Sequence, residues 1–216
     1  MILQSVRQNA LALALFALIT ALVLSSVNNL TADRIANAER LVAQKALLEI
    51  VPPDRHDNDL LMDTRPIPEQ FWPLLGLDES ADIYIARSNG IPIAAIIPSI
   101  SRDGYSGDIA MIVGVNVDGS IAGARVVDHR ETPGLGDKIE LRKSQWILDF
   151  DGRSLKNTAT SAWAVKKNGG EFDQFTGATI TPRAVINQLV STLNYFEQDK
   201  SRLLNLDQPP LTQSQK

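Results

Sequence analysis

Two pairs of strand-like segments, each joined by a short turn, constrain the fold of this chain more than any other feature. Residues 82–98 read DIYIARSNGIPIAAIIP, two apolar runs around an Asn-Gly dipeptide that is typical of two-residue hairpin turns. Residues 109–129 read IAMIVGVNVDGSIAGARVVDH, with an Asp-Gly dipeptide at the corresponding place. Two hairpins predict a mostly antiparallel sheet of at least four strands.

Two helices are predicted beside this sheet. Residues 137–150 carry apolar side chains on one face with charges between them, which is typical of an amphipathic helix. A second helix is expected from about Arg183, where apolar residues recur at helical spacing. Thr181 is predicted as its N-cap and Pro182, which has no backbone N–H, as its first residue. The fold class is therefore α+β, with the main domain over residues 81–199.

An uncharged segment near the N-terminus predicts a membrane anchor. No charged residue occurs between Arg7 and Asp33, and residues 9–28 reach the roughly 20 residues needed to cross a bilayer as a helix. A cleaved signal peptide is the alternative, but no small-x-small cleavage site lies at the right distance. We therefore predict one transmembrane helix over residues 9–28. Residues 1–8 are then cytoplasmic, and the main domain lies on the periplasmic side of a bacterial inner membrane.

The segments around the main domain are predicted to be simpler. Residues 29–53 are expected to form a stalk or packing helix, with Thr31 as its N-cap and Pro52-Pro53 at its end. Residues 54–80 are polar, irregular and proline-bearing, which indicates a linker or a wrapping loop. Residues 200–216 are expected to form a polar tail.

Composition excludes several kinds of chemistry. The chain has no cysteine, which excludes disulfides, thiolate metal sites and Cys-ligated iron–sulfur clusters. The two histidines, His56 and His129, are too few for a His-rich metal cage, so each is interpreted as a surface or loop residue. The net charge of -4 offers no basic surface for nucleic acid. Redox chemistry in this chain would depend on a cofactor that needs no sulfur ligand.

The segment DQFTGATITPRAV, residues 173–185, stands at the start of the expected C-terminal helix. Local physics alone explains it as a turn that leads into a capped helix. That interpretation leaves Thr179 unexplained, a second hydroxyl two residues before the predicted cap, with Gly177 and Ala178 clearing space beside it. Because a helix N-terminus offers unpaired N–H groups and the positive end of the helix dipole, a phosphate near Thr179 would be stabilised.

Residues 173–179 resemble the D-x-x-[ST]-G-A-T signature at which a flavin transferase attaches FMN, through a phosphoester, to the final threonine. Residues 104–139 and 163–185 are similar to the FMN-binding domain of the G subunit of the Rnf (Rsx) electron-transport complex. The Rnf G subunit is itself a relative of the C subunit of the Na⁺-pumping NADH:quinone reductase. The family also has one N-terminal membrane anchor followed by a periplasmic domain, which is the architecture predicted above for this chain. The resemblance implies that FMN is covalently attached to Thr179.

The resemblance also implies which residues surround the flavin. The transferase is expected to recognise Asp173, Thr176, Gly177 and Ala178. Thr181 agrees with the extended form of the motif and is a further candidate for the cofactor site. A glycine-rich loop is expected to pack against the flavin ring through Glu131, Thr132, Gly134, Leu135 and Gly136. Tyr105 is a candidate for the same pocket, or alternatively a core or rim tyrosine. Lys138 is a candidate for facing the flavin or its phosphate, or alternatively a solvated lysine.

The implied function is that of an electron-carrying subunit in a membrane-bound, ion-translocating oxidoreductase. Such a complex couples electron transfer between ferredoxin and NAD to Na⁺ or H⁺ movement. The implied partners are the other subunits and the flavin transferase. No catalytic residue is expected, because FMN supplies the redox chemistry, and the subunit is not expected to turn over alone. Two alternatives stay open: a membrane-anchored flavin-binding sensor or reductase, and a non-flavin interaction protein.

Overall fold

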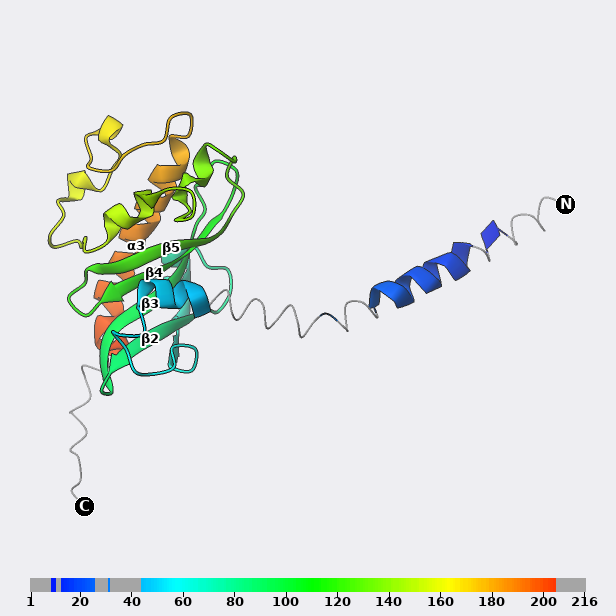
Figure 1. Ribbon diagram of the computed structural model, residues 1–216, viewed down its shortest axis with the longest axis horizontal. Helices are drawn as coiled ribbons and strands as arrows, with labels where there is room; N and C mark the ends of the chain where they lie inside the picture. The colour runs from blue at the N-terminus through cyan, green and yellow to red at the C-terminus, as the bar shows by residue number, and fades with distance from the viewer. Residues whose placement is uncertain (1–8, 11–12, 26–30, 32–43, 205–216) are drawn as a thin grey trace, which may run out of the picture. The chain divides into compact units, whose positions relative to one another are not determined.

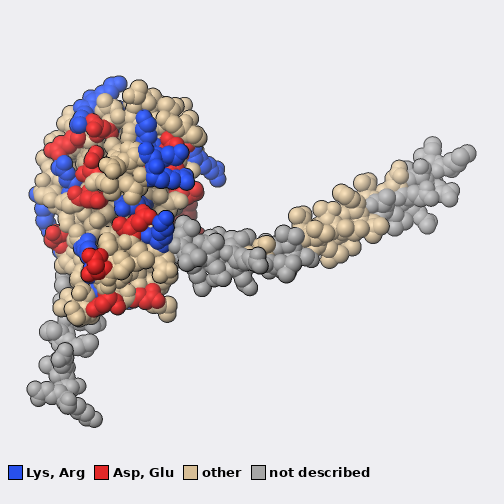
Figure 2. Space-filling model, in the orientation of Figure 1, with Lys and Arg blue, Asp and Glu red and all other residues tan. Residues whose placement is uncertain are grey.

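The computed structural model describes residues 9–10, 13–25, 31 and 44–204 (Figure 1). The chain divides into two compact units, residues 1–43 and 44–216. In the first unit, residues 13–25 form a helix with no charged side chain (Figure 2). Among the described residues, no helix has both the length and the hydropathy needed to cross a membrane. Several positions of the predicted anchor and stalk lie outside the described residues, namely 11–12, 26–30 and 32–43.

The second unit is built around a five-stranded antiparallel sheet. Its strands are β1 (Thr64–Pro66), β2 (Asp82–Ser88), β3 (Ile91–Ser101), β4 (Ile109–Asn116) and β5 (Ile121–His129). The order across the sheet is β1-β2-β3-β4-β5, so each strand pairs with its neighbours in sequence (Figure 1). Both predicted hairpins are confirmed. The face of this unit seen in Figure 2 carries acidic and basic side chains interspersed.

The two hairpins turn in different ways. Between β2 and β3, Asn89 and Gly90 both have positive φ, 52° and 77°, as a tight two-residue turn requires. Between β4 and β5 the connection is longer, and the Asp118 carboxylate accepts hydrogen bonds from the N–H and the hydroxyl of Ser120 at 2.8 and 2.6 Å. These bonds hold the pKa of Asp118 below its ordinary value. The Asp-Gly dipeptide thus predicted the position of this hairpin correctly, but the loop is longer than two residues.

One long helix and several short helical turns accompany the sheet. They are η1 (Glu69–Phe71), α2 (Trp72–Leu75), η2 (Gly136–Ile139), η3 (Gln145–Phe150), η4 (Thr160–Ala162), η5 (Lys166–Asn168) and α3 (Ile180–Leu203). The helix α3 contacts β3 and β4. Ala95 and Ile97 of β3 belong to the same buried core as Val185 and Leu189 of α3. The strand period of two thus directs alternate residues toward this helix.

The residues between those positions face a second, smaller core. Ala94 and Ile96 of β3 are buried there together with Leu47 and Ile50. Residues 44–50 are helical. For this last part of the predicted helix, packing against the sheet is the alternative that the structure supports. The sheet is therefore buried on both faces, which explains why β3 is apolar at nearly every position.

A pair of glycines seats this helix on the sheet. Gly114 of β4 and Gly123 of β5 are directly opposite each other in the strand register. A Cβ atom at Gly114 would lie 2.2 Å from Cγ2 of Ile50, a distance at which the Ile50 side chain would have to move. Beside this contact the Arg125 guanidinium pairs with the Glu49 carboxylate at 3.1 Å. The approach of helix and sheet thus depends on a missing side chain.

The prediction of one helix over residues 137–150 is wrong. The segment forms η2 and η3 with a turn between them. Ser144 has extended backbone, φ -158°, and its hydroxyl accepts the N–H of Trp146. This side-chain cap starts a new helical turn and so competes with a continuous helix. The expected apolar face is nevertheless buried, at Ile139, Trp146 and Ile147.

Residues 54–80 are more ordered than a linker. They contain β1, η1 and α2, and they bury Ile67 and Leu75 against the main core. The compact unit accordingly begins at Gln44, well before the predicted boundary at residue 81. At the other end, α3 runs past residue 200 because Leu203 and Leu204 are buried. Residues 205–216 of the predicted tail lie outside the described residues.

Candidate functional site

A buried carboxylate joins three segments that carry predicted site residues. Glu131, which follows β5, is only 4% exposed. One of its oxygens accepts the hydroxyl of Thr181 in the first turn of α3, and the other accepts the backbone N–H of Ser106 at 2.9 Å. The glycine-rich loop, the loop that carries Tyr105 and the start of α3 are thus held together by one side chain.

Two glycines allow the chain to close around this carboxylate. A Cβ atom at Gly136 would lie 2.8 Å from a carboxylate oxygen of Glu131 and 2.9 Å from the hydroxyl oxygen of Thr181. A Cβ atom at Gly104 would lie 3.0 Å from the other carboxylate oxygen. Any larger residue at Gly136 would therefore push apart the hydrogen bond that fixes the loop to α3.

The predicted glycine-rich loop lies against the Thr-Gly-Ala-Thr turn. Its backbone is closed by a hydrogen bond from the N–H of Leu135 to the carbonyl of Thr132 at 3.1 Å. Gly134 has φ 78°, and its N–H donates to the carboxylate of Asp137 at 2.8 Å. A Cβ atom at Gly177 would lie 3.1 Å from a methyl carbon of Leu135. Two predicted parts of the site are thus neighbours.

The start of this loop is fixed by His129. Its Nδ1 accepts the backbone N–H of Glu131 at 3.0 Å, so its Nε2 carries the proton and donates to Glu140 at 2.7 Å. Hydrogen bonds from Arg142 and then from His129 hold the pKa of Glu140 below its ordinary value. The His129 side chain is 10% exposed at the end of β5, so its interpretation as a surface or loop residue is wrong. His56 does lie in a loop.

The transferase motif begins on an anchored backbone. The indole N–H of Trp146 donates to the carbonyl of Asp173 at 2.9 Å, and the same ring packs edge-on against Phe175 at 5.0 Å. The Asp173 carboxylate points the other way and pairs with Lys166 at 2.7 Å, with both side chains more than half exposed. The carboxylate of Asp173, which the transferase is predicted to recognise, is therefore on the surface, while the backbone of Asp173 is held by the buried Trp146.

A tight turn presents the middle of the motif. The N–H of Ala178 donates to the carbonyl of Phe175 at 3.1 Å. Gly177 has φ 82°, a conformation that favours glycine, and Thr176 and Gly177 are both exposed. The turn is thus accessible to another protein from outside.

The first residue of α3 differs from the prediction. The helix begins at Ile180, and Thr179 takes the N-cap position with φ -90° and ψ -21°. Thr181, predicted as the cap, is fully buried inside the first turn because its hydroxyl is used by Glu131. Pro182 remains in that turn, where a missing N–H costs no hydrogen bond. The side chain of Thr179 makes no capping hydrogen bond, so its hydroxyl is available.

Exposed apolar side chains occur in the same segments. Tyr105 is 68% exposed, Leu135 40% and Ile180, next to Thr179, 44%. Tyr105 is therefore not a core residue. Lys138 is partly exposed, and no ion pair joins it to the described residues. A free hydroxyl beside apolar surface suits a ligand with a phosphate end and a flat apolar end, so these residues fit FMN.

Curated relatives resemble the chain over nearly its whole length. The G subunit of the ion-translocating oxidoreductase complex of Pseudomonas aeruginosa strain UCBPP-PA14 is 48% identical over 202 residues, which is 93% of each chain. The protein of the same name from Shewanella loihica is 44% identical over 94% of each chain. That of Vibrio atlanticus is 42% identical over 94% of this chain and 95% of its own. The chain belongs to the family of Rnf G subunits.

Two family matches divide the chain as the resemblance suggested. The RnfG N-terminal region matches residues 1–50. The FMN-binding domain matches residues 104–194, a range that contains every predicted site residue from Tyr105 to Thr181. This match supports FMN as the cofactor of the Rnf G fold described above.

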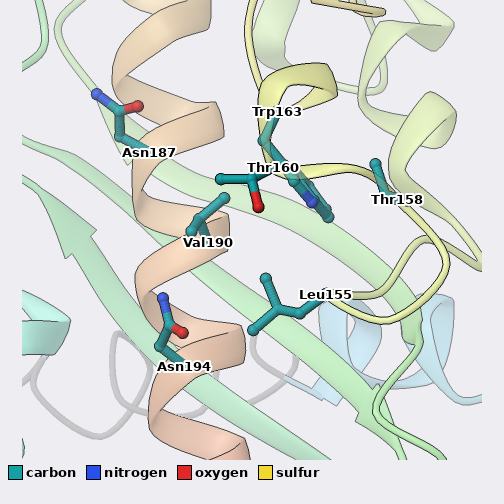
Figure 3. A pocket seen from close by; sticks show the side chains of 7 residues that line it. All are labelled: Leu155, Thr158, Thr160, Trp163, Asn187, Val190 and Asn194. Carbon is teal, nitrogen blue, oxygen red and sulfur yellow. The ribbon is translucent and has the colours of Figure 1, made fainter.

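Two cavities beside α3 are lined by none of the predicted site residues. The larger, of about 460 Å³, lies between α3 and the segment before it, and is lined by Leu155, Thr158, Thr160, Trp163, Asn187, Val190 and Asn194 (Figure 3). The smaller, of about 200 Å³, shares Trp163 and Asn187 with it and adds Arg183. Sequence reasoning missed Arg183, although its spacing of four residues from Thr179 on a helix was a usable signal.

Proposed function

We propose that this chain is an electron-carrying subunit of a membrane-bound, ion-translocating oxidoreductase, with FMN joined by a phosphoester to Thr179. One observation carries the proposal: the final threonine of the D-x-x-T-G-A-T motif stands at the N-cap of α3 with no capping hydrogen bond. The relatives named above are subunits of ion-translocating oxidoreductase complexes, and an FMN-binding domain match covers the motif.

The attachment chemistry needs only an accessible hydroxyl and an activated flavin donor. A bond forms between Oγ of Thr179 and the phosphorus of FMN, while the bond from that phosphorus to the donor's leaving group breaks. The hydroxyl proton leaves with the leaving group or passes to solvent. The exposed turn from Asp173 to Ala178 is the surface that the transferase recognises. The first N–H groups of an α-helix have no intrahelical partner, and at the start of α3 such groups favour the phosphate.

The remaining predicted residues shape the surroundings of the attached group. FMN, when bound, supplies the capacity to accept and release electrons. Leu135, Tyr105 and Ile180 provide apolar surface for its ring, and the backbone of Thr132 and Gly134 brings the loop close. Glu131 holds this loop on α3 through Thr181. Lys138 adds positive charge near the ring or phosphate.

The N-terminal segment provides the link to the membrane in this proposal. Residues 9–28 form a single anchor in a bacterial inner membrane, residues 1–8 are cytoplasmic, and the flavin domain lies on the periplasmic side. The uncharged helix of residues 13–25 and the match of residues 1–50 to the RnfG N-terminal region support this arrangement. The partners are the other Rnf subunits, which together couple ferredoxin and NAD electron transfer to Na⁺ or H⁺ movement.

The test is the intact mass of the protein from its native membrane, with peptide mapping around residue 179. We expect a mass increase of one FMN phosphoester on that peptide. Thr179→Ala should be folded and flavin-free, because it removes a side chain that makes no cap bond and should cost less than about 1 kcal/mol. Thr179→Ser, which keeps a hydroxyl, is the matched control and should retain some flavin.

Two results would contradict the proposal. Covalent flavin on the Thr179→Ala protein would place the attachment elsewhere. An unmodified wild-type peptide from cells that contain the transferase would leave the motif as a helix start only, and would favour the non-flavin interaction protein.

A further inference from the structure

The smaller cavity beside α3 has an unusual set of hydrogen-bonding groups. It is lined by Trp163, Ala164, Val165, Asn168, Arg183, Ile186 and Asn187, and no carboxylate is among these residues. Trp163 is only 8% exposed, and its indole N–H has no hydrogen-bond partner. The Nε–H of Arg183 is also buried without a partner. The unmet capacity at this cavity consists of donors, so the missing group is an acceptor.

The charge of Arg183 is also unmatched. Its guanidinium donates to the amide oxygen of Asn168 at 2.8 Å, a neutral partner. In the part of the chain that the structure describes, no carboxylate pairs with it, whereas nearby Lys166 pairs with Asp173. A partly buried cation without a counter-ion is unfavourable, because its desolvation is not offset by an opposite charge. The acceptor that this position calls for is therefore an anion.

The position of Arg183 relates this cation to Thr179. The backbone of Thr179 is already close to helical, so residues 179 and 183 lie on the same face of α3. Long side chains on a helix lean toward its N-terminus, which is the direction of Thr179 from Arg183. Figure 3 shows Asn187, Val190 and Asn194 farther along α3, beside the segment that carries Thr160 and Trp163.

We propose that Arg183 binds the phosphate of the flavin on Thr179, an inference that rests on the proposed function. A phosphate joined to both flavin and threonine keeps one negative charge and two free oxygens. The fork of N–H groups on arginine matches such oxygens better than a lysine ammonium does. The attached phosphate then supplies both the acceptor and the counter-ion that Arg183 lacks.

The first test needs no substitution. Arginine Nε–H signals are compared by ¹H–¹⁵N NMR in the full-length protein purified with and without co-expressed flavin transferase. We expect the Arg183 signal to move when flavin is attached. Arg55 is the internal control, because its guanidinium also donates to an asparagine oxygen at 2.8 Å and lies outside the site. An Arg183 signal that stays in place in the flavin-bearing protein would overturn the inference.

The second test measures how fast the transferase modifies three variants. Arg183→Gln is expected to slow attachment about tenfold, in line with the loss of one charge-assisted hydrogen bond. Arg183→Lys should fall between this variant and the wild type, and Arg55→Gln should react at the wild-type rate. Thermal melts of the unmodified proteins show that each variant is folded. A wild-type rate for Arg183→Gln would overturn the inference.

The two proposals fail in different ways. A wild-type chain that gains no flavin mass in the presence of the transferase refutes the proposed function and this inference with it. A wild-type chain that is modified at Thr179, with an unmoved Arg183 signal, refutes only the role of Arg183.

Discussion

The two ends of α3 differ in how their polar side chains are matched. At the C-terminal end, the hydroxyl of Tyr195 donates to Asp199 at 2.6 Å and Arg202 binds the same carboxylate. At the N-terminal end, Thr179 makes no capping bond and Arg183 has no carboxylate partner in the described part of the chain. The first end is complete by itself and serves stability. The second has the unmatched groups expected of a place that binds something else.

Removal of Asp199 should have the largest effect on stability. This carboxylate is 8% exposed, and its loss leaves Tyr195 and the partly exposed Arg202 without their acceptor. We expect Asp199→Ala to lower the free energy of unfolding by about 3 kcal/mol, measured by urea denaturation, with unchanged flavin attachment. The nearby exposed Glu197→Ala should change it by less than about 0.5 kcal/mol. A small effect of Asp199→Ala would show that the paired end is dispensable.

Glu131 is the exception at the N-terminal end, because both of its carboxylate oxygens accept a hydrogen bond. Glu131→Ala leaves the buried hydroxyl of Thr181 and the backbone N–H of Ser106 without their acceptor, and should cost about 2 kcal/mol. Glu131→Gln keeps an acceptor and should cost about half as much. Hydrogen exchange at the Ser106 amide should accelerate most in the alanine variant. Equal exchange in all three proteins would mean that Glu131 does not hold this loop.

High pH should weaken the C-terminal end of α3. Burial, and then the bond to Asp199, raises the pKa of Tyr195 in the folded protein. Above the ordinary tyrosine pKa of about 10, the unfolded chain loses this proton and the folded chain keeps it, so stability present below pH 10 is lost as pH rises. Between pH 9 and pH 11 the wild type should lose about 1.4 kcal/mol more than Tyr195→Phe. Parallel pH profiles for the two proteins would contradict this.

The smallest stability effect is expected at the exposed pair of Asp173 and Lys166. Both Asp173→Asn and Lys166→Gln break this ion pair, and each should change the free energy of unfolding by less than about 0.5 kcal/mol. If the transferase recognises the carboxylate, as proposed above, flavin attachment should fall several-fold only in Asp173→Asn. An equal fall in both variants would show that the ion pair matters instead.

Local patterns predicted the sheet well. Strand alternation and the Asn-Gly and Asp-Gly dipeptides act within a few residues, so β2 to β5 were found close to their observed bounds. The errors arose where distant residues decide. Thr181 is not the N-cap because Glu131, fifty positions earlier in the sequence, takes its hydroxyl. β1 was missed because its three residues gain their order only by pairing with β2.

The residues of the candidate site that belong to a sequence motif could be predicted. The resemblance named the residues from Asp173 to Thr179 and the loop from Glu131 to Gly136, and the structure brings the two together. It gave no role to Trp163 or Arg183, because an unpaired donor is recognisable only after its surroundings are known. The role of Glu131 as a tether between segments also required the fold.

The seat of Ile50 on Gly114 has a consequence for how the family can vary. Since a Cβ at Gly114 would lie 2.2 Å from the Ile50 side chain, the two positions share one fixed volume. At Gly123 the nearest atom of Ile50 would be 3.5 Å away, an ordinary contact. Homologues with alanine at position 114 should therefore carry a smaller residue at position 50, whereas position 123 should vary independently. Covariation of positions 50 and 114 among homologues would therefore be the evolutionary record of this contact.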